Sequence, residues 1–93
     1  QQYLIDVEGH TDNVPINTQQ YPSNWELSTA RATTIVRSFL NEGISPNKLR
    51  ASGFADTRPK ASNYNTDGTQ NPQAQAENRR VTIYISFKPS PSP

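Results

Sequence analysis

The chain has 93 residues, enough for one small domain, and 31% of them are hydrophobic. Nine basic residues against eight acidic ones leave a net charge of +1, which argues against a dedicated nucleic-acid-binding protein and against charge-driven disorder. The absence of cysteine excludes disulfides, thiolate metal sites and thiol nucleophiles. No apolar run approaches the roughly 18 residues of a membrane span. The first residue is Gln rather than Met, so we expect a processed piece of a longer protein.

The first expected element is a strand at residues 3–8, because apolar and polar residues alternate along it. One face of this strand carries Tyr3, Ile5 and Val7. Gly9 ends the strand. A polar loop with two prolines, which prevent helix formation, is expected from residue 10 to residue 22.

The strongest signal is a helix expected at residues 24–42. Ser23 and Glu26 fit the S-x-x-E capping box at its start, and Gly43 suits the left-handed position after its end. At about 100° per residue, one stripe of the helix is apolar and is predicted to be buried. That stripe consists of Trp25, Ala32, Ile35, Val36, Phe39 and Leu40.

Two further strands complete the expected sheet, at residues 49–53 and 81–87. The order strand, long helix, strand predicts a βαβ unit with parallel strands and a right-handed crossover. The expected fold class is therefore α/β, or an α+β sandwich, with a mixed sheet packed on one long helix. Besides the helix stripe, we expect the strands to bury Ile5, Val7, Val81, Ile83 and Ile85.

The stretch from residue 55 to residue 78 is rich in Asn, Gln, Thr, Ala and Pro and has almost no large apolar residues. A loop of this length is unusual in a compact domain, and we predict that it is the most mobile ordered segment. Pro72 suits the first position of a helical turn at residues 73–78. The Pro/Ser-rich residues 89–93 are expected to form a disordered tail after a domain at residues 1–88.

Catalytic constellations are weak in this sequence. Glu8, His10 and Asp12 alternate like metal ligands, but the chain has a single histidine. A structural role, in which His10 braces the strand-to-loop turn by hydrogen bonds, is favoured. A Ser-His-Asp triad would lack the G-x-S-x-G nucleophile elbow. We therefore expect no catalytic residue, no metal site and no cofactor.

Charged residues near the start of the expected helix are more suggestive. Arg31 lies at the edge of the apolar stripe, where long charged residues usually just extend to solvent. Asp12 lies in the loop that leads to the same helix, and the two side chains suit either a bound zwitterion or a plain salt bridge with each other. Arg79 and Arg80, before the last strand, are likewise open to ion pairing or to recognition of a small anion.

Four sequence blocks carry a family resemblance. They read DVEGHTDN at 6–13, NWELSTARA at 24–32, GFAD at 53–56 and NRRV at 78–81. In this order, and across most of the chain, they closely resemble the OmpA-like peptidoglycan-binding domain. The run SNWELS, which starts at Ser23, is most similar to the peptidoglycan-anchoring subunit of flagellar stators, of the MotB/MotS/PomB type.

The resemblance implies a non-catalytic module that binds the peptide stem of peptidoglycan, usually at diaminopimelate. It implies that Asp12 and Arg31 hold the amino-acid end of that residue, that Asn24 and Arg79 add supporting contacts, and that backbone amides from Thr11 to Asn13 help. It also implies a stator ion-channel subunit as partner, a homodimer, an extracytoplasmic or periplasmic location, and an N-terminal membrane helix outside this sequence. No nucleic acid is expected as a partner.

The sequence departs from the family in two places. The family fold begins with a strand and a helix that precede the first strand here, so we expect an exposed sheet edge or a neighbouring chain that covers it. Residues 68–75 look like an insertion. Two alternatives stay open: a peptidoglycan-associated lipoprotein or outer-membrane anchor of the same family and, more weakly, a cell-wall hydrolase, which would need a metal or two acidic residues across a cleft.

Overall fold

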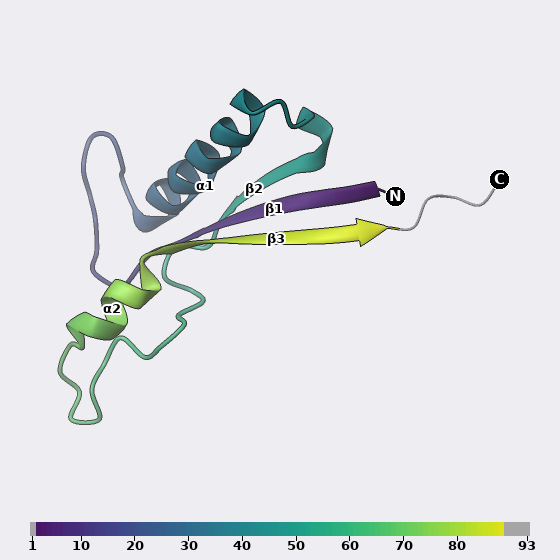
Figure 1. Ribbon diagram of the computed structural model, residues 1–93. Helices are drawn as coiled ribbons and strands as arrows, with labels where there is room; N and C mark the ends of the chain where they lie inside the picture. Colours follow the sequence, from purple (N-terminus) through teal and green to yellow (C-terminus); the bar gives the residue numbers. More distant parts are fainter. Residues whose placement is uncertain (1, 89–93) are drawn as a thin grey trace.

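A computed structural model describes residues 2–88, which form a three-stranded sheet, one long helix on it and a short helix beyond its end (Figure 1). The elements are β1 (Gln2–His10), α1 (Asn24–Asn41), the 3₁₀ turn η1 (Pro46–Lys48), β2 (Leu49–Gly53), α2 (Pro72–Asn78) and β3 (Arg80–Lys88). The expected tail at 89–93 lies outside the described residues. None of the described helices is long and apolar enough to cross a membrane.

The sheet has the strand order β2-β1-β3, with β1 in the centre. β1 pairs in parallel with β2, where Ile5 lies opposite Leu49, and antiparallel with β3, where Val7 lies opposite Ile83. The mixed sheet and the β1–α1–β2 unit confirm the predicted fold class. All three strands lie where the sequence predicts them, and β1 and β3 extend beyond the predicted bounds at both ends.

The helix α1 is bounded by the predicted signals. The Ser23 hydroxyl accepts a hydrogen bond from the backbone N–H of Trp25 at 3.1 Å and donates one to the Glu26 carboxylate at 2.6 Å. After the helix, Gly43 adopts a φ of 93°, and the N–H groups that follow bond back into the last turn. The helix ends at Asn41, one residue before the predicted end.

The hydrophobic core is small and lies between α1 and the β1–β2 side of the sheet. Its buried centre is Ile5, Val7 and Ala32, as predicted. Half-buried apolar residues pack around this centre, namely Tyr3, Ile35, Val36, Phe39, Ile44, Leu49 and Val81. A core of this size gives the fold little reserve of hydrophobic stabilisation.

The prediction that Trp25 and Leu40 are buried is wrong, because their exposed fractions are 51% and 38%. At the N-terminal half of α1 the reason is a very close helix–strand crossing. A Cβ atom on Gly9 would lie 1.9 Å from the backbone oxygen of Ser28, so β1 and α1 touch there through backbone atoms. Small residues occupy the crossing, and the large indole lies outside it. Leu40 lies in the last turn of α1, at the rim of the core.

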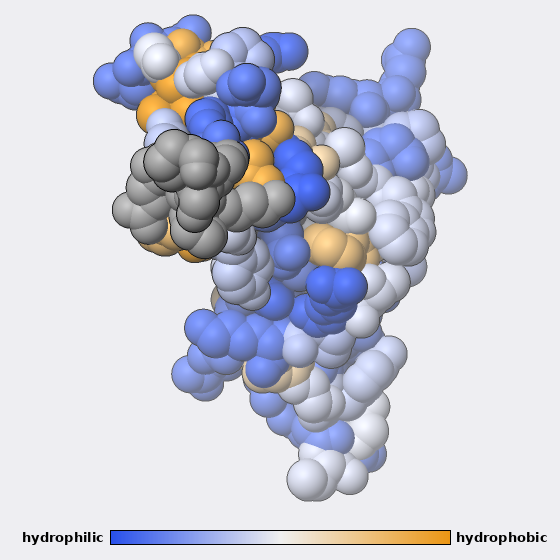
Figure 2. Space-filling view, turned by 90° about the vertical axis from the view of Figure 1, so that its right-hand side faces the viewer, coloured by the Kyte–Doolittle hydropathy of each residue, from blue (hydrophilic) through white to orange (hydrophobic). Residues whose placement is uncertain are grey.

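The prediction that Ile83 and Ile85 are buried is also wrong, because they are 44% and 55% exposed, and Phe87 is 63% exposed. The helix α1 packs on β1 and β2, so the same face of β3 is largely uncovered among residues 2–88 beyond Val81, which still packs against the core. Figure 2 shows hydrophobic residues at the surface in the upper part of the molecule, where Figure 1 places α1 and the sheet. In the order β2-β1-β3, β3 is also an edge strand, and no strand within residues 2–88 pairs with its outer edge, in line with the expected exposed edge.

The pair Val7 and Ile83 provides a test of this packing. The two residues lie opposite each other in neighbouring strands, but Val7 is fully buried and Ile83 is 44% exposed. Val7→Ala should lower the free energy of unfolding by about 2 kcal/mol, and Ile83→Ala by less than about 1 kcal/mol, although it removes more carbon atoms. Urea unfolding of both variants measures the difference. Equal losses would show that β3 is covered in solution.

The 55–78 segment has more regular structure than its composition predicts. Pro72 begins α2, as expected for a proline at the first helical position, and Asn71 caps that helix by accepting the N–H of Ala74 at 3.1 Å. Tyr64 and Gln70 form an isolated β-bridge. This lower part of the molecule is mostly hydrophilic in Figure 2. The expected mobility of the segment stays a prediction.

Side-chain amides take the place of apolar contacts in this segment. Asn78 is fully buried, and its side-chain oxygen accepts the backbone N–H groups of Lys60 at 2.7 Å and Ala61 at 3.1 Å. Its side-chain nitrogen donates to the carbonyl of Ala61 at 2.8 Å and to the amide oxygen of Asn63 at 2.7 Å. These four hydrogen bonds satisfy the amide fully and fix the loop against the start of β3.

Candidate functional site

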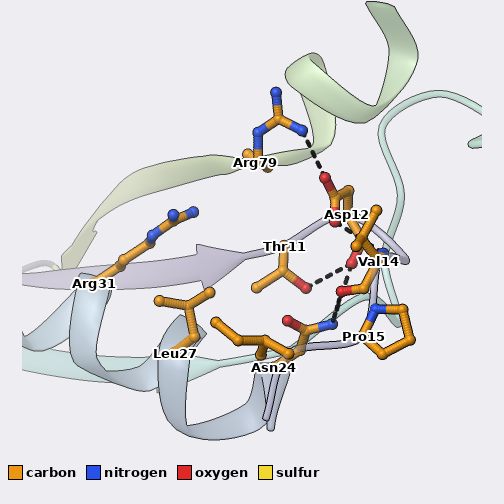
Figure 3. A pocket seen from close by; sticks show the side chains of 9 residues that line it. Thr11, Asp12, Val14, Pro15, Asn24, Leu27, Arg31 and Arg79 are labelled. Carbon is orange, nitrogen blue, oxygen red and sulfur yellow. Dashed lines mark hydrogen bonds and ion pairs between the residues drawn. The ribbon is translucent and has the colours of Figure 1, made fainter. Parts of the chain in front are cut away.

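A pocket of about 350 Å³ opens where β1 ends, between the first turns of α1 and the start of β3 (Figure 3). Five of the six predicted binding residues line it: Asp12, Arg31, Asn24, Arg79 and Thr11. The remaining lining residues are Val14, Pro15, Ile16 and Leu27, which were not predicted. The signal for the first three is the apolar run at 14–16, which is unusual within an otherwise polar loop.

The carboxylate of Asp12 is held from two sides. Its Oδ1 accepts the backbone N–H of Val14 at 2.9 Å, and its Oδ2 accepts a hydrogen bond from Nη1 of Arg79 at 2.6 Å. Because of these partners, the side chain is only 9% exposed. The salt bridge left open by the sequence is formed with Arg79 rather than with Arg31.

Arg31 lies in the second turn of α1, and its guanidinium extends toward the pocket (Figure 3). The residue is half-buried, and no described residue forms a hydrogen bond or an ion pair with it. Arg79, which is almost half exposed, lies on the β3 side of the same pocket. Two guanidinium groups and one carboxylate therefore leave the lining with an excess of one positive charge.

Thr11 and Asn24 support the loop that carries Asp12. The Thr11 hydroxyl donates to the backbone carbonyl of Asp12 at 2.8 Å. The side-chain N–H₂ of Asn24 donates to the carbonyl of Val14 at 3.1 Å and, more weakly, to that of Asp12 at 3.5 Å. Both residues line the pocket, but their present contacts shape its wall.

Asn13 is the one predicted site residue that the structure places outside the pocket lining. Its side-chain oxygen accepts a hydrogen bond from Gln75 at 2.9 Å, and its nitrogen donates to Gln70 at 3.3 Å. Asn13 therefore joins the loop between β1 and α1, which we call the site loop, to α2 and the residues before it. A role in ligand binding for Asn13 stays a prediction.

Ala55 connects the helix to the site and was not predicted. Its backbone N–H donates to the hydroxyl of Ser28 in α1 at 3.0 Å, and its carbonyl accepts the N–H of Thr11 at 2.8 Å. Ala55 is buried and has a φ of 52°, a left-handed conformation that is uncommon for residues other than glycine. This strained residue holds the turn after β2 against both α1 and the loop that carries Asp12.

His10 braces the end of β1, as predicted, but it does so mainly by packing and not mainly by the predicted hydrogen bonds. Its ring is 2% exposed and stacks on Phe54 with 5.3 Å between ring centroids. Its Nε2 lies 3.4 Å from a carboxylate oxygen of Glu8, and none of the described residues offers a partner to the buried Nδ1. Residues 2–88 contain no cluster of three metal-ligating side chains.

Protonation of His10 should weaken the fold. Burial is the main cause that lowers the pKa of His10 below 6.5, and Arg80 adds to it, while Glu8 opposes the shift. Since the folded pKa lies below the unfolded one, the contribution to stability is complete above about pH 6.5 and is lost as the pH falls through the folded pKa. The free energy of unfolding should therefore fall more steeply below pH 6.5 in the parent chain than in His10→Gln. Parallel pH profiles would contradict this account.

Comparison with known sequences now identifies the family. Residues 1–80 match the sequence profile of the OmpA family. The chain belongs to the OmpA family. Among curated proteins, the uncharacterized protein YtxE of Bacillus subtilis is 45% identical over 82 residues, 87% of this chain and 31% of that protein. Motility protein B of Helicobacter pylori strain J99 is 35% identical over 82 residues, 88% of this chain and 30% of that protein.

Solved structures of two other proteins share the fold of this chain. The C-terminal domain of Helicobacter pylori MotB matches with a TM-score of 0.77 at 28% identity, over 96% of this chain and 63% of that chain. The cell wall anchor of the T6SS from Pseudomonas aeruginosa matches with a TM-score of 0.75 at 38% identity, over 90% of this chain and 54% of that chain. These matches confirm the mixed sheet and the resemblance to MotB. The chain spans about a third of the length of its curated relatives.

Proposed function

We propose that this OmpA-family chain is a non-catalytic module that binds the peptide stem of peptidoglycan at diaminopimelate and thereby anchors a larger complex to the cell wall. The observation that carries the proposal is the pocket in which Asp12, Arg31 and Arg79 gather at one end of the sheet. Its excess positive charge and its apolar wall suit a peptide that ends in a carboxylate. Similarity to a cell wall anchor adds support.

The anchored complex is proposed to be the stator of a flagellar motor. Similarity to motility protein B and to MotB domains supports this choice. In that assignment the chain lies outside the cytoplasmic membrane, as a homodimer. Its partner is an ion-channel subunit, reached through parts of the protein beyond this sequence, which include a membrane helix.

A second anchoring role has one observation in its favour. Identity to the T6SS cell wall anchor is 38%, higher than the 28% to the MotB domain of similar TM-score. An anchor of another assembly, or a lipoprotein or outer-membrane anchor of the family, would use the same pocket. The sequence that precedes the domain separates these roles, since a stator subunit carries a membrane helix and a lipoprotein carries a lipid-modified cysteine.

The geometry favours binding over hydrolysis of the wall. A glycoside hydrolase needs two carboxyl groups across its cleft, whereas the pocket offers the single carboxylate of Asp12, which is already paired with Arg79. The pocket thus has groups that hold charge but no second acid for proton transfer. We infer a binding module on this ground.

Incubation with purified sacculi tests the proposal. The chain should sediment with the sacculi, and the supernatant should contain no soluble wall fragments released above a protein-free control. A chain that stays in the supernatant would refute wall binding. Released fragments would instead favour the hydrolase.

A further inference from the structure

The carboxylate of Asp12 in the pocket already has hydrogen-bond partners within the chain. Each oxygen of Asp12 already accepts a hydrogen bond, Oδ1 from the Val14 backbone and Oδ2 from Arg79 at 2.6 Å. An ammonium group brought to Oδ2 would lie beside the guanidinium of Arg79, and like charges repel each other. An ammonium at Oδ2 must therefore either displace Arg79 or take the second acceptor position of that oxygen beside a like charge, and either way it gains less than at an unpaired carboxylate.

Arg31 is in the opposite situation. Its half-buried guanidinium faces the pocket, and within residues 2–88 it has no hydrogen-bond or ion-pair partner (Figure 3). A guanidinium has five N–H donors and no acceptor, and its planar fork matches a carboxylate. A ligand carboxylate at Arg31 therefore makes new charge-assisted hydrogen bonds without breaking any within the described chain.

We propose that the pocket selects its ligand by the carboxylate of the free amino-acid end, through Arg31, and that the ligand's ammonium contributes much less to selection. This inference rests on the proposed function, since it concerns the same site and the diaminopimelate stem. The chain would then distinguish wall peptides by one chemical modification, the amidation of this carboxylate. Stem peptides in which this carboxylate is amidated are rejected.

The amide is rejected for a geometric and an electrostatic reason. A carboxamide has nearly the shape of a carboxylate, but it is neutral, and one of its two acceptor oxygens is replaced by an N–H₂ donor. When the amide meets the guanidinium of Arg31, which has only donors, it forms one hydrogen bond fewer than the carboxylate, and its N–H₂ group faces an N–H group of the arginine. A site built for a charged acceptor strongly disfavours an analogue that lacks it.

Three soluble stem tripeptides separate the contributions, measured by isothermal titration calorimetry on the parent chain. The first ends in diaminopimelate, the second has the carboxylate of its free end amidated, and the third has 2-aminopimelate, which keeps this carboxylate and lacks the ammonium. Amidation should weaken binding at least about tenfold, the scale of a charge-assisted hydrogen bond. Loss of the ammonium should weaken it by a smaller factor.

Two arginine variants assign the selectivity to the residue. Arg31→Gln should remove most of the difference between the acid and the amide. Arg37→Gln is the matched control, because Arg37 lies exposed on the same helix outside the pocket, and it should keep the full difference. Circular dichroism melts show whether each variant is folded.

The outcomes distinguish this inference from the proposed function. Equal affinity for the acid and the amide, or an equal or larger loss without the ammonium, would overturn the inference and leave stem binding intact. Binding of none of the three peptides would overturn both. Selectivity that survives in a folded Arg31→Gln chain would remove Arg31 as its source.

Discussion

Arg31→Ala should lower the affinity of the chain for purified sacculi at least about tenfold, the scale of a lost charge-assisted hydrogen bond. The side chain faces the pocket and makes no hydrogen bond or ion pair with any described residue. Its removal should therefore cost binding and leave the melting temperature nearly unchanged. Co-sedimentation over a range of sacculus concentrations, with a thermal melt of the same sample, measures both quantities.

Arg37→Ala is the control for this experiment, because it removes the same charge from an exposed site on the same helix. It should bind like the parent chain. Asp12→Ala is a poorer test, because Asp12 also accepts the backbone N–H of Val14 and pairs with Arg79. Its replacement would therefore change the loop as well as the binding site. Normal wall binding by a folded Arg31→Ala chain would refute the site, and a collapsed melt would assign Arg31 a structural role.

Asn78→Ala should cost about 3 kcal/mol or more in the free energy of unfolding. The change leaves the backbone N–H groups of Lys60 and Ala61, together with the amide of Asn63, without the partner that the structure shows. A buried group that loses its partner costs about 1–3 kcal/mol. In a domain with a total of about 5–15 kcal/mol, this is a large fraction.

Urea unfolding of Asn78→Ala, with Asn17→Ala as control, measures this loss. Asn17 is an exposed asparagine of the site loop, and its replacement should change stability by less than about 0.5 kcal/mol. If the two variants were equally stable, the amide network around Asn78 would contribute nothing. The 55–78 segment would then be as loosely held as its composition suggests.

Local patterns predicted the elements of this fold well. Alternation located β1, β2 and β3, and the Ser23 cap and Gly43 bounded α1 to within one residue. Such signals are local, because they depend on neighbouring residues and on the period of the element. Pro72 marked the start of α2 for the same reason.

Burial was predicted less well, because it depends on what lies opposite an element. The apolar period of β3 is clear, but no described residue covers Ile83 and Ile85. Trp25 belongs to the apolar stripe of α1, yet the backbone contact at Gly9 leaves room only for small residues. Periodicity identifies a face, and only the three-dimensional packing shows which part of it is covered.

Most of the charged and polar residues of the candidate site were predicted, but the ion pair among them was not. The family resemblance gave five of the pocket-lining residues, while the partner of Asp12 proved to be Arg79, which follows it by 67 positions. The hydrogen-bond network of the 55–78 segment was not predicted, because it comes from side-chain amides that bond to distant backbone groups. Composition counts such residues as polar and does not show whether they are paired.

Nuclear magnetic resonance of the ¹⁵N-labelled chain, titrated with a soluble diaminopimelate tripeptide, tests the central claim most directly. The account predicts saturable chemical-shift changes that cluster at residues 11–16, at residues 24–31 and at Arg79, with the exposed face of β3 unaffected. Shifts confined to β3 or to the outer face of α1, or no shifts at millimolar peptide, would contradict the assignment of this pocket as the wall-binding site.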